Sequence, residues 1–191
     1  ATTEGEAAIN GHGLSSIDLS ALSSTNHLRL EQMAVANLSL GALAGSGSVY
    51  VQGENLESLN LDALSTGTEV YLRGQNLTSI NVSALQSADS LSVFARSLDA
   101  LDLSALTAVS EATLDVGLAT LDLSQLAEAD ALYIQSPDGT SPTSIDLSAI
   151  ESAGDIELIG LQDLTDFSLG NGTASINSLS VGFSSLADLD L

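Results

Sequence analysis

The chain has 191 residues, a length typical of one domain, and its 25 acidic and 3 basic residues give a formal net charge of −22. All three bases are arginines, so the composition excludes a basic nucleic-acid interface and argues against docking on an anionic membrane. The absence of cysteine excludes disulfides, thiolate zinc sites and a thiol nucleophile, and only two histidines are present for acid–base catalysis. No apolar run approaches the length needed to insert into a bilayer.

A repeat of about 21 residues runs along the chain and is built on the unit LxxLxLSxL. The central apolar residues of successive copies are separated by 20 to 24 residues. In chain order the copies are LSSIDLSAL (14–22), VANLSLGAL (35–43), LESLNLDAL (56–64), LTSINVSAL (77–85), LDALDLSAL (98–106), LATLDLSQL (118–126), TSIDLSAI (143–150), LTDFSLGN (164–171) and LADLDL (186–191).

A second pattern, an apolar–polar–apolar triplet, follows most copies about eleven residues later. Strict alternation indicates a strand, and the intervening Ser, Thr, Gly, Asn and Asp residues are turn formers. One coil therefore consists of strand, turn, strand and turn. The triplets are LRL (28–30), VYV (49–51), VYL (70–72), LSV (91–93), LDV (114–116), LYI (132–134), IEL (156–158) and LSV (179–181).

Strands in successive coils can pair only in parallel, because each is reached after one full circuit of the chain. The sequence therefore predicts a mainly β fold, a parallel right-handed β-helix of about nine coils of 20–24 residues with two parallel sheets and an aliphatic interior. Leu61, Val82 and Leu103 are expected to be stacked neighbours. Residues 1–13 are expected to form an N-terminal edge or cap, and residues 14–191 the solenoid.

Both prolines, Pro137 and Pro142, fall within SPDGTSPT, where the repeat is longest. Because proline cannot donate a hydrogen bond to a sheet, we expect an irregular loop at 136–143.

The repeat unit and its triplet resemble leucine-rich-repeat and receptor L-domain-like solenoids, in particular the LTSLDLSSL type of microbial cell-surface and cell-wall proteins. Leu22, Leu106 and Ile150 stand where the usual leucine-rich repeat has Asn or Cys, which favours a β-helix-like coil with two sheets. The resemblance implies recognition or scaffolding outside the cell, and it carries over no catalytic residues.

Polar side chains occupy the outward position of the first strand in each coil, and three of them, Asp102, Asp122 and Asp146, fall on adjacent coils. Like charges so close are expected to raise one another's pKa or to gather cations. One hypothesis is therefore a strip that binds calcium or mixed cations, and the other is a solvated polar face. No other cofactor is expected.

The outward position of the second strand carries Tyr50, Tyr71 and Tyr133. Tyr50 and Tyr71 lie on adjacent coils and are expected to stack as an aromatic platform with Arg73 nearby. Such a face suits a glycan or protein ligand, and the alternative is cross-strand pairing that only stabilises the sheet. The same column is expected to hold Arg29, Ser92, Asp115, Glu157 and Ser180.

The final copy places Leu186, Leu189 and Leu191 on core positions with no cap after them. An uncovered strand edge is a template for another chain. Two explanations stay open: neighbouring domains of a larger surface protein, or self-association end to end. Residues 97–191 hold sixteen acids and no base, whereas residues 1–96 hold nine acids and all three arginines.

Together these features predict an extracellular or cell-surface protein without enzymatic activity. The first interpretation is a structural or adhesive building block of the surface or matrix that assembles end to end into filaments. The alternative is a receptor-L-like recognition module that binds a glycan or protein on the tyrosine face. A third interpretation is a β-helix active on polysaccharides through paired carboxylates.

Overall fold

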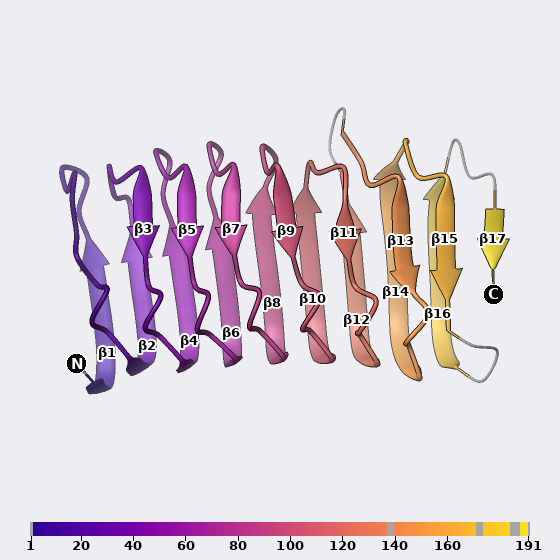
Figure 1. Cartoon of the computed structure of the whole chain (residues 1–191), viewed down its shortest axis with the longest axis horizontal. Helices are drawn as coiled ribbons and strands as arrows, with labels where there is room; N and C mark the ends of the chain where they lie inside the picture. The colour runs from indigo at the N-terminus through magenta and orange to yellow at the C-terminus, as the bar shows by residue number, and fades with distance from the viewer. Residues whose placement is uncertain (1, 137–139, 171–173, 184–187, 191) are drawn as a thin grey trace.

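The computed structural model describes residues 2–136, 140–170, 174–183 and 188–190, and they wind into a β-solenoid of two parallel sheets (Figure 1). In Figure 1 the strands of one sheet lie behind and point up, those of the other lie in front and point down, and the coils advance from left to right. This winding is right-handed, as expected. Within the described ranges no helix has the length and apolar character needed to cross a membrane.

After the first coil, which has a strand in sheet A alone, each coil that the structure describes contributes one long strand to the first sheet, sheet A, and one short strand to the second, sheet B. Sheet A contains, in order, β1 (Thr2–Asn10), β2 (Ser24–Glu31), β4 (Gly45–Gln52), β6 (Thr66–Arg73), β8 (Ser87–Ala95), β10 (Ala108–Val116), β12 (Glu128–Gln135), β14 (Ser152–Leu161) and β16 (Ser175–Phe183). Sheet B contains β3 (Asn37–Ser39), β5 (Ser58–Asn60), β7 (Ser79–Asn81), β9 (Ala100–Asp102), β11 (Leu121–Asp122), β13 (Ser144–Leu147), β15 (Asp166–Leu169) and β17 (Asp188–Asp190).

The core between the sheets is made of aliphatic columns. Leu61, Val82 and Leu103 are fully buried, and the Leu61 N–H donates to the carbonyl of Asn81 in the next coil at 2.8 Å. These three residues follow the successive strands β5, β7 and β9, which confirms the predicted stacking. The same column continues through the buried residues Leu40, Leu123, Leu147 and Leu169.

The N-terminal region differs from the repeat pattern. The segment expected as an edge or cap contains β1, which pairs in parallel with β2 and sets Ile9 beside Leu30. The first repeat copy, residues 14–22, forms no strand, and its Ile17 and Leu19 are only partly buried against the core. Sheet A therefore begins one strand earlier than sheet B.

The triplet LDV (114–116) predicted the wrong register for β10. Leu114 pairs with Val93 and Ile134, so the inward pair is Ala112 and Leu114, and Thr113 occupies the column assigned to Asp115. Ala112, Leu114 and Val116 are all buried, so the alternation extends over five residues. The small side chain of Ala112 did not stand out as an inward position, so the sequence pattern placed the inward pair at Leu114 and Val116.

The ends of the expected loop at 136–143 are anchored to the solenoid, and residues 137–139 lie outside the described residues. The Ser136 hydroxyl donates to the carbonyl of Thr140. Asp163 Oδ2 accepts from the Ser141 N–H at 3.2 Å, and the Asp163 N–H donates to Ser141 Oγ at 2.7 Å. Ser136 and Ser141 are both buried.

Stability of this fold should depend on the columns. We expect Leu103→Ala to lower the free energy of unfolding by about 2–5 kcal/mol, because the neighbouring coils cannot close the cavity without breaking their pairing. Urea unfolding followed by circular dichroism measures this. Ser110→Ala, on the exposed side of β10, is the control and should change stability by less than about 0.5 kcal/mol. Equal effects of the two variants would contradict the stacked core.

Candidate functional site on the outer face of sheet A

An aromatic ladder crosses the outer face of sheet A near its N-terminal coils. The rings of Tyr50 and Tyr71 are stacked, with centroids 4.5 Å apart and planes 3° from parallel, as their positions in the repeat predict. The guanidinium carbon of Arg29 lies 4.8 Å from the centroid of the Tyr50 ring, and Phe94 packs at 5.5 Å against Tyr71 with a tilt of 43°. We call Arg29, Tyr50, Tyr71 and Phe94 the aromatic ladder.

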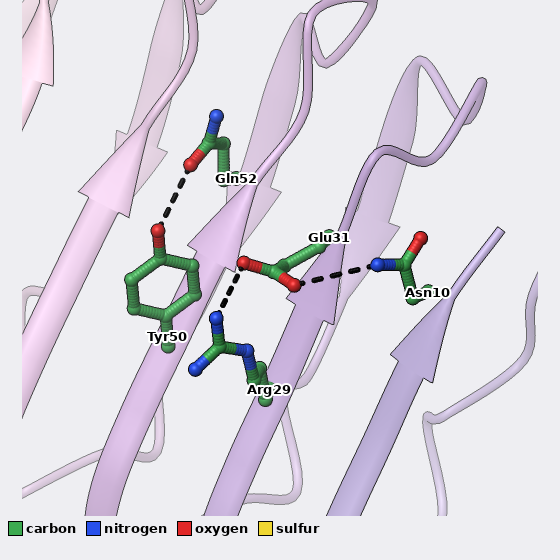
Figure 2. A network of polar contacts seen from close by, with 5 residues as sticks. All are labelled: Asn10, Arg29, Glu31, Tyr50 and Gln52. Atoms are coloured by element: carbon green, nitrogen blue, oxygen red, sulfur yellow. Dashed lines mark hydrogen bonds and ion pairs between the residues drawn. The ribbon is translucent and has the colours of Figure 1, made fainter. Parts of the chain in front are cut away.

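Polar contacts hold the first two members of the ladder in place (Figure 2). The Arg29 guanidinium forms an ion pair with Glu31 at 2.8 Å, and Glu31 also accepts from the Asn10 side chain at 3.5 Å. The Tyr50 hydroxyl donates to Gln52 Oε1 at 2.9 Å. Burial is the main cause that raises the pKa of Tyr50, so its ring keeps a neutral phenol.

A surface pocket of about 580 Å³ opens beside the far end of the ladder. Arg73 stands one position after the Tyr71–Leu72 pair in β6, and its pKa is raised chiefly by a hydrogen bond with the Tyr71 side chain. Arg73 and Arg96, two of the three arginines of the chain, both line this pocket. The lining residues are Arg73, Gly74, Gln75, Phe94, Arg96 and Asp115.

Asp115 gives this pocket a buried acceptor without a complete set of partners. The residue is 7% exposed, and its Oδ2 forms an ion pair with the guanidinium of Arg96 at 3.1 Å. Its Oδ1 is buried and has no hydrogen-bond partner. A side chain at Gly117 would collide with the carbonyl oxygen of Arg96. Glycine at this position therefore lets the backbone at Arg96 lie close to the backbone that follows β10. An unpaired buried oxygen of this kind costs about 1–3 kcal/mol unless a ligand satisfies it.

Of the residues predicted for a ligand face, Tyr50, Tyr71 and Arg73 come together here, whereas Tyr133 does not. Tyr133 pairs with Thr113 and Glu157 and lines a separate pocket of about 220 Å³ together with the exposed Ile159.

The sequence interpretation missed Phe94 and Arg96 as site residues and gave Asp115 to the wrong column. With the β10 triplet corrected to 112–114, the residue that directly follows each triplet carries the missing signal. Glu31, Gln52, Arg73, Phe94 and Asp115 recur at intervals of 21 residues, and they form one column in register.

The acidic column of sheet B has the predicted register but different chemistry. Asp122 pairs with Asp102 on one side and with Asp146 on the other. Asp102 Oδ1 accepts from the hydroxyl of Ser104 at 2.6 Å and from its N–H at 3.0 Å. These bonds lower the pKa of Asp102, and hydrogen bonds from Ser148 likewise lower the pKa of Asp146.

The expected rise in pKa is therefore wrong for Asp102 and Asp146, because hydrogen bonds to the charged form outweigh the effect of burial. In the parts of the chain that the structure describes, no group of three or more His, Cys, Asp or Glu residues is placed to hold a metal ion. The three carboxylates act as turn acceptors at the ends of their strands.

The expected assembly edge falls largely outside the described residues. Leu186 and Leu191 lie in the parts that are not described, and Leu189 is described only as backbone in β17.

No family model, no curated protein and no solved structure matches the chain.

The turn contacts predict how stability depends on pH. Because hydrogen bonds lower the folded pKa of Asp102 below 3.8, the ionised carboxylate contributes stability that is complete above that value and is lost as pH falls through the folded pKa. We expect Ser104→Ala to raise the pKa of Asp102, measured by NMR titration of the carboxyl carbon. Ser124→Ala, one coil along, is the control and should leave the pKa of Asp102 unchanged. An unchanged pKa in Ser104→Ala would disprove the hydroxyl contribution.

Proposed function

We propose that the chain is an extracellular recognition module that works by adhesion and without catalysis, and that the outer face of sheet A binds its ligand. The observation that carries the proposal is the stack of Tyr50 on Tyr71 beside the pocket that contains Arg73 and Arg96. Flat, partly exposed rings that are held rigidly offer contact area at a low cost in conformational entropy.

A glycan is the ligand class that this face suits best. Both faces of the Tyr50 ring are covered, by Arg29 and by Tyr71, so the apolar face of a sugar ring would pack on Phe94, which lines the pocket, while its hydroxyls bond to charged side chains at the rim. The aromatic ladder and the pocket offer both kinds of contact side by side on neighbouring coils. Coils repeat at about 4.8 Å, so a polymer lying along the solenoid axis would meet similar positions in successive coils.

We further propose kinship with the leucine-rich-repeat and L-domain-like solenoids of cell surfaces. The LxxLxLSxL unit and the parallel stacking of its copies support it. Recognition rather than catalysis is favoured because the acids of sheet B are engaged in turns and repeat from coil to coil. A catalytic pair would instead stand apart from the repeat.

Binding to a panel of soluble polysaccharides tests the recognition function. We expect the chain to bind at least one of galactan, xylan, glucomannan or galacturonan in affinity electrophoresis. Tyr71→Ala should weaken that binding about tenfold, which corresponds to about 1.4 kcal/mol. Tyr133→Ala is the matched control because it also removes a tyrosine from the outer face of sheet A, but one outside the ladder. It should weaken binding less than twofold. No binding to any member, or equal losses in the two variants, would refute the proposal.

A second proposed function, end-to-end assembly, is favoured by the edges of sheet A. Among the described strands, β1 pairs only with β2 and β16 pairs only with β14. The two outer edges of a parallel sheet differ from one another, so β16 of one copy would add to β1 of the next without closing a ring.

Electron microscopy of the purified chain over a range of concentrations tests this assembly. We expect filaments to lengthen with concentration and also with salt, because salt screens the repulsion between copies with a net charge of −22. A monodisperse single particle at every concentration and salt level would rule it out.

A further inference from the structure

We propose that the pocket lined by Arg73, Phe94, Arg96 and Asp115 binds a sugar unit that carries a carboxylate, of the uronic-acid class. This inference rests on the proposed recognition function and specifies its ligand. Three features of the pocket support it: its charge, the unpaired oxygen of Asp115, and the aromatic wall.

The charge of the pocket is opposite to that of the chain. Arg73 and Arg96 stand against one carboxylate, that of Asp115, whereas the whole chain has a formal net charge of −22. The Arg96 side chain is 61% exposed, so it can turn donors toward a ligand while one nitrogen holds Asp115. A guanidinium binds a carboxylate with two parallel hydrogen bonds, which makes a carboxylate a well-matched anion here.

The unpaired Oδ1 of Asp115 needs a hydrogen-bond donor. Asp115 lines the pocket and Arg96 holds its other oxygen, so a ligand donor in the pocket would reach Oδ1 after a small rotation of the carboxylate. A ligand that consists only of acceptors, such as a bare carboxylate, would leave this oxygen unpaired. A hydroxyl group next to the carboxylate on the same ring satisfies both requirements.

The aromatic wall selects a ring rather than a flexible chain. Phe94 lines the pocket and packs at 5.5 Å against Tyr71, which continues the stack from Tyr50. A sugar ring in the pocket would therefore lie at the end of an aromatic surface that can hold the next units of the same glycan. An acidic peptide supplies the carboxylate and N–H donors but not the rigid ring, so the aromatic wall favours the saccharide.

Calorimetric titration with tetragalacturonate and with its fully methyl-esterified form tests the proposal. The two probes share the ring and the hydroxyls, and they differ in charge. A tetramer is used because the acidic remainder of the chain repels a long polyanion. We expect the acid to bind at least tenfold more tightly than the ester, and we expect Arg73→Gln and Arg96→Gln each to remove most of this preference.

Arg29→Gln is the charge-matched control, because it removes the same charge from the same face but outside the pocket. Arg29 belongs to the aromatic ladder, so its loss should affect the binding of acid and ester alike and change the ratio of their affinities less than twofold. Asp115→Asn should weaken binding of both probes, since the oxygen that accepts the hydroxyl is altered while the net charge becomes less negative. Thermal unfolding checks that each variant is folded.

The outcomes separate this inference from the recognition function. If a neutral polysaccharide binds through Tyr71 but acid and ester bind equally, the uronate site is wrong and the recognition function stands. A preference for the acid that survives both Arg73→Gln and Arg96→Gln would also overturn the site. Equal binding of penta-glutamate would assign the pocket to acidic peptides and overturn the saccharide. If no glycan binds at all, both proposals fail.

Discussion

Vertical stacking of equivalent residues is the constraint on which the rest of this structure depends. A coil of about 21 residues cannot enclose a core of its own, so each aliphatic side chain is buried by its counterparts in the coils above and below. Leu61, Val82 and Leu103 illustrate this, because all three are fully buried in a column one residue wide. A change of register in one coil would disturb two interfaces at once, which keeps the repeat regular.

The same constraint acts on the outer surface with a different result. Outward side chains do not decide whether the coil closes, so they can vary from coil to coil while the column beneath stays aliphatic. Tyr50 and Tyr71 stack because parallel pairing in register sets them one strand apart. In sheet B, the serine two residues after Asp102 and the serine two residues after Asp146 each donate a hydrogen bond to that carboxylate. Local hydrogen bonds thus favour the charged form of both carboxylates.

The fold could be predicted from the sequence because its period and its alternation are both local signals. Side-chain size misled the register at β10, where Ala112 occupies the place of Leu91, and the weak alternation of Ala7 and Ile9 did not reveal β1. Tyr50, Tyr71 and Arg73 of the candidate site could be predicted from the repeat pattern. Phe94 and Asp115 did not, since each is ordinary alone and only an interval of 21 residues aligns them with Arg73. The unpaired oxygen of Asp115 depends on packing, which no sequence pattern specifies.

The distribution of charge connects the architecture to the proposed functions. All three arginines lie on or next to the outer face of sheet A, and two of them line one pocket. An arginine elsewhere on so acidic a surface would find many carboxylates to pair with. Arg29 pairs with Glu31 and Arg96 with Asp115, both on this same face. The Arg29–Glu31 pair lies at the surface, where such a pair stabilises a fold by about 0–1 kcal/mol, which is too little to explain why Arg29 lies beside the aromatic rings. A ligand that needs both kinds of contact gives a physical reason for their common location.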